Sequence, residues 1–319
     1  MSKLSVDATG FSTYSRLLQN VLRLRRFTVG VTAVTQKESS GLWSDAWRRL
    51  KANRLAMFGL IFLAFEAAIA ILTPWIAPHP FDVQSLENTF ANPSMAHWLG
   101  TDALGRDVLS RLLFGSRISL MVGFLASMVS VIVGVVYGAV AGWFGGKIDS
   151  WMMRIVDVMY ALPFIFLVII LMVYFGRDIR LLFLALGLTQ WLTMARIARG
   201  QVLGLKRKEF VEAAVTVGVP THRLLSRHII PNAIGPVIVY LTLTVPAVIL
   251  EEAFLSFLGL GVQPPHASWG SLISSGVEAM EIAPRLLIAP AIALSLTLFS
   301  LNFLGDGLRD ALDPKGSTD

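Results

Sequence analysis

The sequence of 319 residues contains no cysteine. A disulfide, a zinc site with thiolate ligands and a cysteine nucleophile are therefore excluded as parts of this chain. Charged residues are also scarce: Asp, Glu, Lys and Arg make up 15% of the sequence, whereas they form about a quarter of a typical soluble domain. Because hydrophobic residues reach 55%, the composition is that of a membrane protein.

The sequence also lacks the glycine-rich loop with which many ATPases hold phosphate. The pair Gly146-Lys147 comes nearest, but position 141 is Ala and position 148 is Ile, so the pattern GxxxxGK[ST] is not met. We therefore expect no ATP hydrolysis by this chemistry within the chain, and no enzymatic activity of its own.

Six apolar segments are each long enough to cross ~30 Å of hydrocarbon. They predict an all-α polytopic membrane protein with six transmembrane helices near residues 54–77, 117–143, 158–175, 181–198, 233–258 and 286–305. The expected organisation is an N-terminal segment (1–53), a first helix (54–77), an outer loop (78–116), a core (117–305) and a C-terminal tail (306–319).

The net charge of +6 is explained by membrane topology rather than by a nucleic-acid partner. Most Lys and Arg residues lie in segments 1–53, 144–157, 196–232 and 306–319, and few lie in 78–117, 176–180 and 259–285. By the positive-inside rule, both termini are predicted to be cytoplasmic. Residues 43–53 predict a short amphipathic helix on the membrane surface, with its tryptophans at the interface.

Residues 206–232, here called the elbow, form a basic stretch between two apolar runs. Apolar residues at helical spacing predict a helix that Gly218 ends in a left-handed conformation. A second short helix is predicted to restart with Pro220 as its first residue or Thr221 as its cap. Pro231 is predicted to end that helix, because proline has no N–H to donate.

The elbow resembles the EAA loop of ABC-importer permeases, on the run Glu212-Ala213-Ala214, Gly218 and Ile229-Ile230-Pro231-Asn232. The resemblance implies a type-1 ABC-importer permease fold, in which the short helix after the glycine couples closure of an ATPase dimer to the membrane helices. The residues expected to carry this coupling are Glu212, Ala213, Ala214, Gly218, Thr221, Arg223, Arg227 and Pro231.

Three further stretches resemble the C-type subunit of the dipeptide and oligopeptide importers: GTDALGRDVLSR (100–111), LSFLGLGVQPPHASWG (255–270) and NFLGDGLRDALDPK (302–315). The resemblance implies a bacterial cytoplasmic (inner) membrane protein that forms half of a peptide pathway. The implied partners are a homologous B-type permease, two cytoplasmic subunits that bind ATP, an extracytoplasmic substrate-binding protein, a peptide substrate and membrane lipid. No cofactor and no nucleic acid is expected for this chain.

Other cargoes and other classes of protein stay open at this point. Related importers carry nickel chelates, glutathione or antimicrobial peptides. A secondary transporter is disfavoured because we find no inverted repeat. A membrane-embedded enzyme is disfavoured because the five histidines, at 79, 97, 222, 228 and 266, are scattered over the sequence.

Glu251 and Glu252 are the candidate residues of the translocation pathway, because carboxylates at membrane depth usually face the bundle interior or a water-filled cavity. They differ by about 100° around a helix, so at most one is expected to point into the pathway. Glu252 matches a glutamate of the family and is expected to be structural. Glu251 is expected to tune selectivity, and Glu66 to bond between helices.

Three local expectations concern packing and charge. Gly134, Gly138 and Gly142 predict a close approach of two helices, either within the subunit or between subunits. Asp107 and Arg111, spaced i,i+4, are expected to pair, and we predict no metal site because His97 and Asp102 lack a zinc-like ligand set. Three charged residues of the loop at 142–163 are expected to brace that loop against the elbow: Asp149, Arg154 and Asp157.

Overall fold

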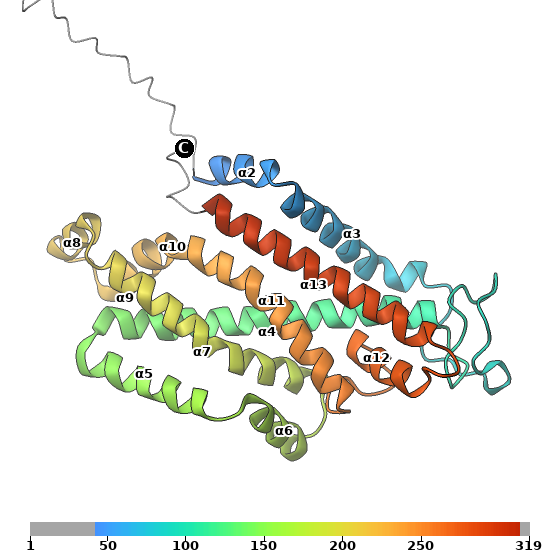
Figure 1. Cartoon of the computed structure of the whole chain (residues 1–319). Helices are drawn as coiled ribbons and strands as arrows, with labels where there is room; N and C mark the ends of the chain where they lie inside the picture. Colours follow the sequence, from blue (N-terminus) through green and yellow to red (C-terminus); the bar gives the residue numbers. More distant parts are fainter. Residues whose placement is uncertain (1–41, 313–319) are drawn as a thin grey trace, which may run out of the picture. The chain divides into compact units, whose positions relative to one another are not determined.

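The computed structural model describes residues 42–312, and expectations for residues 1–41 and 313–319 lie outside the described residues. The helical bundle lies within one compact unit, which begins at Ala46. Apart from an isolated bridge between Thr101 and Asp107, the regular structure of residues 42–312 is helical, so the all-α prediction is confirmed (Figure 1). The helices are α2 (Leu42–Ala52), α3 (Arg54–Ile76), η1 (Leu86–Asn88), α4 (Val108–Phe144), α5 (Gly146–Ala161), α6 (Phe164–Phe175), α7 (Ile179–Leu205), α8 (Glu209–Thr216), α9 (Thr221–Leu224), η2 (Leu225–Ile229), α10 (Ile230–Asn232), α11 (Ile234–Phe257), α12 (Trp269–Glu278) and α13 (Arg285–Leu312).

Five of the described helices, namely α3, α4, α7, α11 and α13, are long and apolar enough to span a membrane. A sixth span exists if α5 and α6 count as one, although their axes differ by 84°. The prediction of a single helix over 158–175 is therefore wrong. The chain is extended at Leu162, because a residue before proline avoids the helical region. With 12 residues, α6 alone measures about 18 Å.

Helix α4 begins at Val108, nine positions before the predicted start at 117. The side chain of Asp107 caps this helix by accepting a hydrogen bond of 2.8 Å from the backbone N–H of Ser110. The predicted pair with Arg111 is wrong: Arg111 lies 3.3 Å from Asp102 instead. Asp107 is used as a helix cap, which satisfies a backbone donor that has no partner within the helix.

The three glycines of α4 allow it to pack closely against α7. An added Cβ at Gly138 would lie 2.2 Å from the carbonyl oxygen of Ala195, and at Gly142 it would lie 2.9 Å from that of Arg199. At Gly134 it would lie 2.6 Å from the Cβ of Met194. Of the two alternatives, the structure therefore contains the close approach within the subunit (Figure 1).

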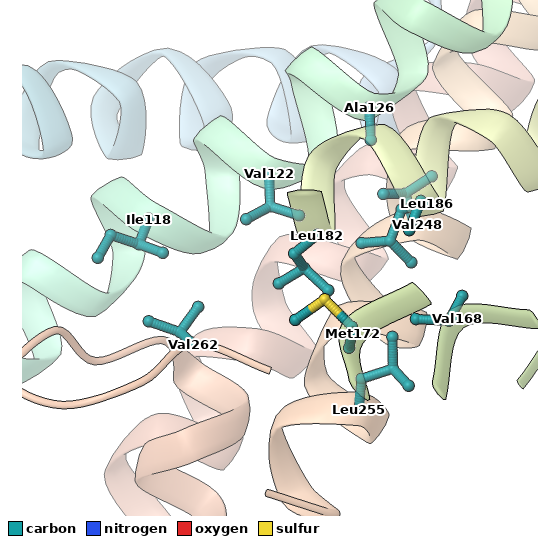
Figure 2. Close-up of a cluster of buried hydrophobic side chains, with 11 residues drawn as sticks. Ile118, Val122, Ala126, Val168, Met172, Leu182, Leu186, Val248, Leu255 and Val262 are labelled. Carbon is teal, nitrogen blue, oxygen red and sulfur yellow. The ribbon is translucent and has the colours of Figure 1, made fainter. Parts of the chain in front are cut away.

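Helix α6 is anchored through only one of its faces. Val168 and Met172 are fully or almost fully buried in a cluster with side chains of α4, α7 and α11 (Figure 2). Phe166, Ile170 and Val173 lie on exposed positions of the same helix. A helix that is apolar all round and exposed on one side needs lipid or another apolar surface there.

Helix α2 confirms the short helix predicted at 43–53. Ala46 and Leu50 are buried against Ala56 and Ala311, so one face packs on α3 and α13. Trp47 is 46% exposed, and the ammonium of Lys51 lies 5.1 Å from the centre of its ring. This amphipathic arrangement fits a helix at a membrane surface.

Candidate functional site

The first turn of the elbow confirms that Gly218 ends its helix in a left-handed conformation. The residue has φ of 82°, and the hydrogen bonds at the end of α8 run from Gly218 N to Val215 O (2.9 Å) and from Val219 N to Ala214 O (3.1 Å). This pair of bonds is the Schellman motif, which requires a left-handed residue at the glycine position. Among the described residues, a Cβ at Gly218 would meet nothing within 4 Å, so the need for glycine comes from the backbone and not from crowding.

The second half of the elbow differs from its prediction at both ends. Pro220 is the N-cap of α9 and Thr221 its first residue, one position away from the predicted arrangement. Pro231 does not end the helix: it lies inside α10, directly after the π-helical turn η2. Because the first residues of a helix need no N–H partner, proline is accepted at this restart.

The inner side of the elbow is fixed to the bundle by apolar side chains. Val211, Leu224 and Ile229 are almost completely buried and form one cluster with Ala139 of α4 and Val202 of α7. The elbow therefore has a defined position on the ends of these two helices.

The outer side of the elbow is exposed and combines apolar and basic groups. Phe210, Val215 and Val217 are 43%, 51% and 84% exposed, and Arg223 and Arg227 lie on exposed positions. Of the residues expected to carry coupling, Ala214 is half-buried and the others are exposed, namely Glu212, Ala213, Gly218, Thr221, Arg223, Arg227 and Pro231.

Two ion pairs tie α5 to α7. Asp149 accepts from Arg199 through two bonds of 2.5 and 2.6 Å, and Asp157 lies 2.6 Å from the guanidinium of Arg196. The predicted brace thus reaches α7 and not the elbow. Arg154 instead lies over the ring of Trp151, 6.0 Å from its centre.

Glu252 belongs to a buried polar network between three helices. Its side chain is fully buried and accepts from Ser256 (2.6 Å) and from Ser119 of α4 (3.4 Å). Ser268, the N-cap of α12, donates to Ser256. Because each buried polar group here has a partner, the network holds α4, α11 and α12 together.

Glu251 lines a cavity of about 320 Å³ between the α5–α6 junction and α7. One carboxylate oxygen accepts from Gln190 at 2.6 Å, and the other has no hydrogen-bond partner within residues 42–312. Tyr160 and Thr193, which are hydrogen-bonded to each other, share the cavity wall with Glu251. The structure therefore separates the adjacent glutamates: Glu252 lies in a closed network and Glu251 at a cavity.

Glu66 bonds between helices, as expected. Its carboxylate on α3 accepts a bond of 2.7 Å from Thr297 of α13.

The sequence reasoning missed the partners of these acids. Ser256 could have been predicted as a partner of Glu252, because Ser256 follows Glu252 by four positions and thus lies on the same helical face. Ser119 and Gln190 carry no such signal, since they lie 133 and 61 positions from their partners.

Comparison with known families identifies two matching models. Residues 134–317 match the family described as binding-protein-dependent transport system inner membrane component. Residues 41–93 match the N-terminal transmembrane domain of oligopeptide transport permease C.

Individual relatives are similar over most of the chain. The oligopeptide transport system permease protein OppC of Haemophilus influenzae is 51% identical over 88% of this chain and 91% of the relative. The dipeptide transport system permease protein DppC of Bacillus subtilis is 49% identical, with 88% of each chain covered. The glutathione transport system permease protein GsiD of Escherichia coli is 39% identical over 86% of this chain and 90% of the relative.

Among solved structures, a chain of the methionine ABC transporter MetNI is 17% identical and matches 65% of this chain and 96% of that one, with a TM-score of 0.49. Family membership therefore follows from the sequence matches alone. The chain belongs to the family of binding-protein-dependent transport system inner membrane components, the permease subunits of ABC importers.

Proposed function

We propose that this chain is the C-type permease subunit of an importer for dipeptides or oligopeptides. The relatives at about half identity are named as dipeptide and oligopeptide permeases, and the glutathione permease is less similar. With a homologous B-type permease, the chain would form the pathway across a bacterial inner membrane.

The elbow is the proposed contact with the cytoplasmic ATPases. The observation that carries this assignment is its two-sided construction: Val211, Leu224 and Ile229 fix it to the bundle, while Val215 and Val217 are exposed. Exposed apolar side chains beside arginines are typical of a surface that another protein covers. One chain has one such elbow, so an ATPase dimer with two grooves requires a second permease chain.

The proposed orientation places the elbow in the cytoplasm and the loop between α3 and α4 outside, where a substrate-binding protein would dock. In support, the elbow and this loop lie at opposite ends of the bundle (Figure 1). Both termini are then cytoplasmic.

Because the sequence contains no cysteine, single introduced cysteines report orientation without background. A cysteine at Ser94 is expected to react with an impermeant thiol reagent in intact cells, and one at Ser226 only after the membrane is opened. Both positions are exposed. The reverse pattern would overturn the orientation.

The substrate is tested by uptake in a strain that lacks the chain. Restoring the wild-type chain should restore uptake of labelled di- or oligopeptides and leave uptake of a nickel chelate or of glutathione unchanged. Restored uptake of one of the latter alone would reassign the cargo and leave the permease assignment intact.

A further inference from the structure

A group of three metal-ligand side chains lies in the loop at the end of the bundle opposite the elbow. His79 follows the end of α3, His97 lies within the loop, and Asp107 is the N-cap of α4. One ligand atom from each of the three lies within 4.8 Å of the others, and the two imidazole centres are 4.6 Å apart. The sequence predicts no metal site here, because His97 and Asp102 alone lack a zinc-like ligand set; Asp102 is bonded to Arg106 instead.

We propose that His79, His97 and Asp107 bind a divalent transition-metal ion, with Zn²⁺ as the best fit. Two histidines and one carboxylate with an open position for water are a donor set that zinc accepts. Ligands at 2.0–2.2 Å around a tetrahedral ion stand about 3.4 Å apart, and these ligand atoms lie within 4.8 Å of one another, so the group must contract by at most about 1.4 Å. His79 and His97 are partly exposed and Asp107 is buried, which leaves one side open to solvent.

The surrounding bonds hold the ligands in suitable orientations. Nε2 of His79 lies 2.7 Å from the carbonyl oxygen of Ala96. An acceptor there keeps the hydrogen on Nε2 and leaves Nδ1 with its lone pair; metal-bound histidines usually donate their other ring N–H to an acceptor in this way. The second carboxylate oxygen of Asp107 accepts from Ser110 N, and the hydroxyl of Ser110 in turn accepts from the backbone N–H of His79 at 3.1 Å.

Binding would insert the ion between two side chains that are already in contact. Nδ1 of His97 lies 2.9 Å from Oδ1 of Asp107. The ion would take the position between them, with Nδ1 and Oδ1 as ligands, and His97 would carry its ring hydrogen on Nε2, so a neutral imidazole changes tautomer and releases no net proton. The ion would then join the end of α3, the loop and the start of α4.

The test uses the purified full-length chain in lipid nanodiscs and Zn²⁺ alone. Calorimetric titration should give one Zn²⁺ per chain, and Co²⁺ should give the visible absorption of a tetrahedral site. Three substitutions should each weaken zinc binding by more than about tenfold: His79→Gln, His97→Gln and Asp107→Asn. Loss of a group that only supports a ligand already lowers metal affinity by about tenfold or more, so loss of a ligand should cost at least as much. Asparagine keeps the capping oxygen of Asp107, so Asp107→Asn separates metal binding from helix capping.

His266→Gln is the matched control. His266 lies at the same end of the bundle, exposed and stacked on Phe81, and its substitution should leave zinc binding unchanged. The proposal is overturned if the wild-type chain binds no stoichiometric zinc, or if binding persists in both His79→Gln and His97→Gln. Neither readout depends on transport, so failure here leaves the proposed function untouched.

Discussion

Two regions depend on glycine for opposite reasons: the contact between α4 and α7, and the elbow. At Gly138 the neighbouring carbonyl leaves no room for a side chain, whereas the surroundings of Gly218 are open and its backbone conformation is left-handed. The first region is a surface completed within the chain. The second is a surface held in a fixed shape and left uncovered, which is what a contact for another protein requires.

The same distinction separates two adjacent residues of α11. Glu252 is enclosed by the serines of a buried network, and Glu251 faces a cavity. Substitutions in the closed regions should therefore reduce stability, and those in the open regions should change function in a folded protein.

The largest effect is expected for Gly138→Ala. The added methyl group would collide with the backbone of α7, and overpacking of this kind costs about 1–3 kcal/mol. We expect a lower free energy of unfolding in detergent and less folded protein in the membrane.

Gly200→Ala in α7 is the matched control for that change, because no atom in the described part of the chain lies within 4 Å of its added Cβ. It should be neutral or stabilising by up to about 1 kcal/mol, the difference in helix propensity. Equal stabilities of the two variants would contradict the closed packing of α4 on α7.

Gly218→Val should uncouple transport from ATP hydrolysis without unfolding the protein. A β-branched residue in the left-handed region costs about 1–2 kcal/mol, so the start of α9 is expected to shift while the protein stays inserted. At equal protein level, peptide uptake should fall, and the stimulation of ATP hydrolysis by peptide should fall with it.

Gly218→Asn tests the backbone explanation, because asparagine visits the left-handed region more readily. It should retain more uptake than Gly218→Val. Normal transport by the valine variant would refute the role of the elbow in coupling.

Glu252→Leu should act through stability. It leaves the hydroxyls of Ser119 and Ser256 without their acceptor, and a buried unsatisfied polar group costs about 1–3 kcal/mol. Thermal unfolding of the purified protein should occur at lower temperature. An unchanged melting temperature would show that the network does not hold α11 in place.

The smallest and most selective effect is expected for Glu251→Gln, which keeps the shape and removes the charge. A carboxylate at a cavity attracts the ammonium group of a peptide more strongly where water is scarce. Uptake of peptides with a free amino terminus should fall more than uptake of N-acetylated ones. Equal effects on both, or none, would make Glu251 a packing residue.

Local features were predictable from the sequence, and contacts across the chain were not. The left-handed turn at Gly218 and the apolar spans follow from residue type and spacing. The break at Leu162–Pro163 was missed because the apolar run continues through it, although proline marked the position. The close approach of α4 was expected from its glycines, but its partner α7 was not. The grouping of His79, His97 and Asp107 depends on how the loop folds, which spacing alone does not reveal.

The π-helical turn η2 sets a rotational phase between the elbow and α11. A π turn holds one residue more than an α turn, and its five residues, Leu225–Ile229, lie directly before the helical path that leads into α11. Deleting one of them would rotate the elbow relative to α11 by about 100°. The length of this one turn therefore sets the direction in which the uncovered surface of the elbow points relative to the helix that carries Glu251 and Glu252.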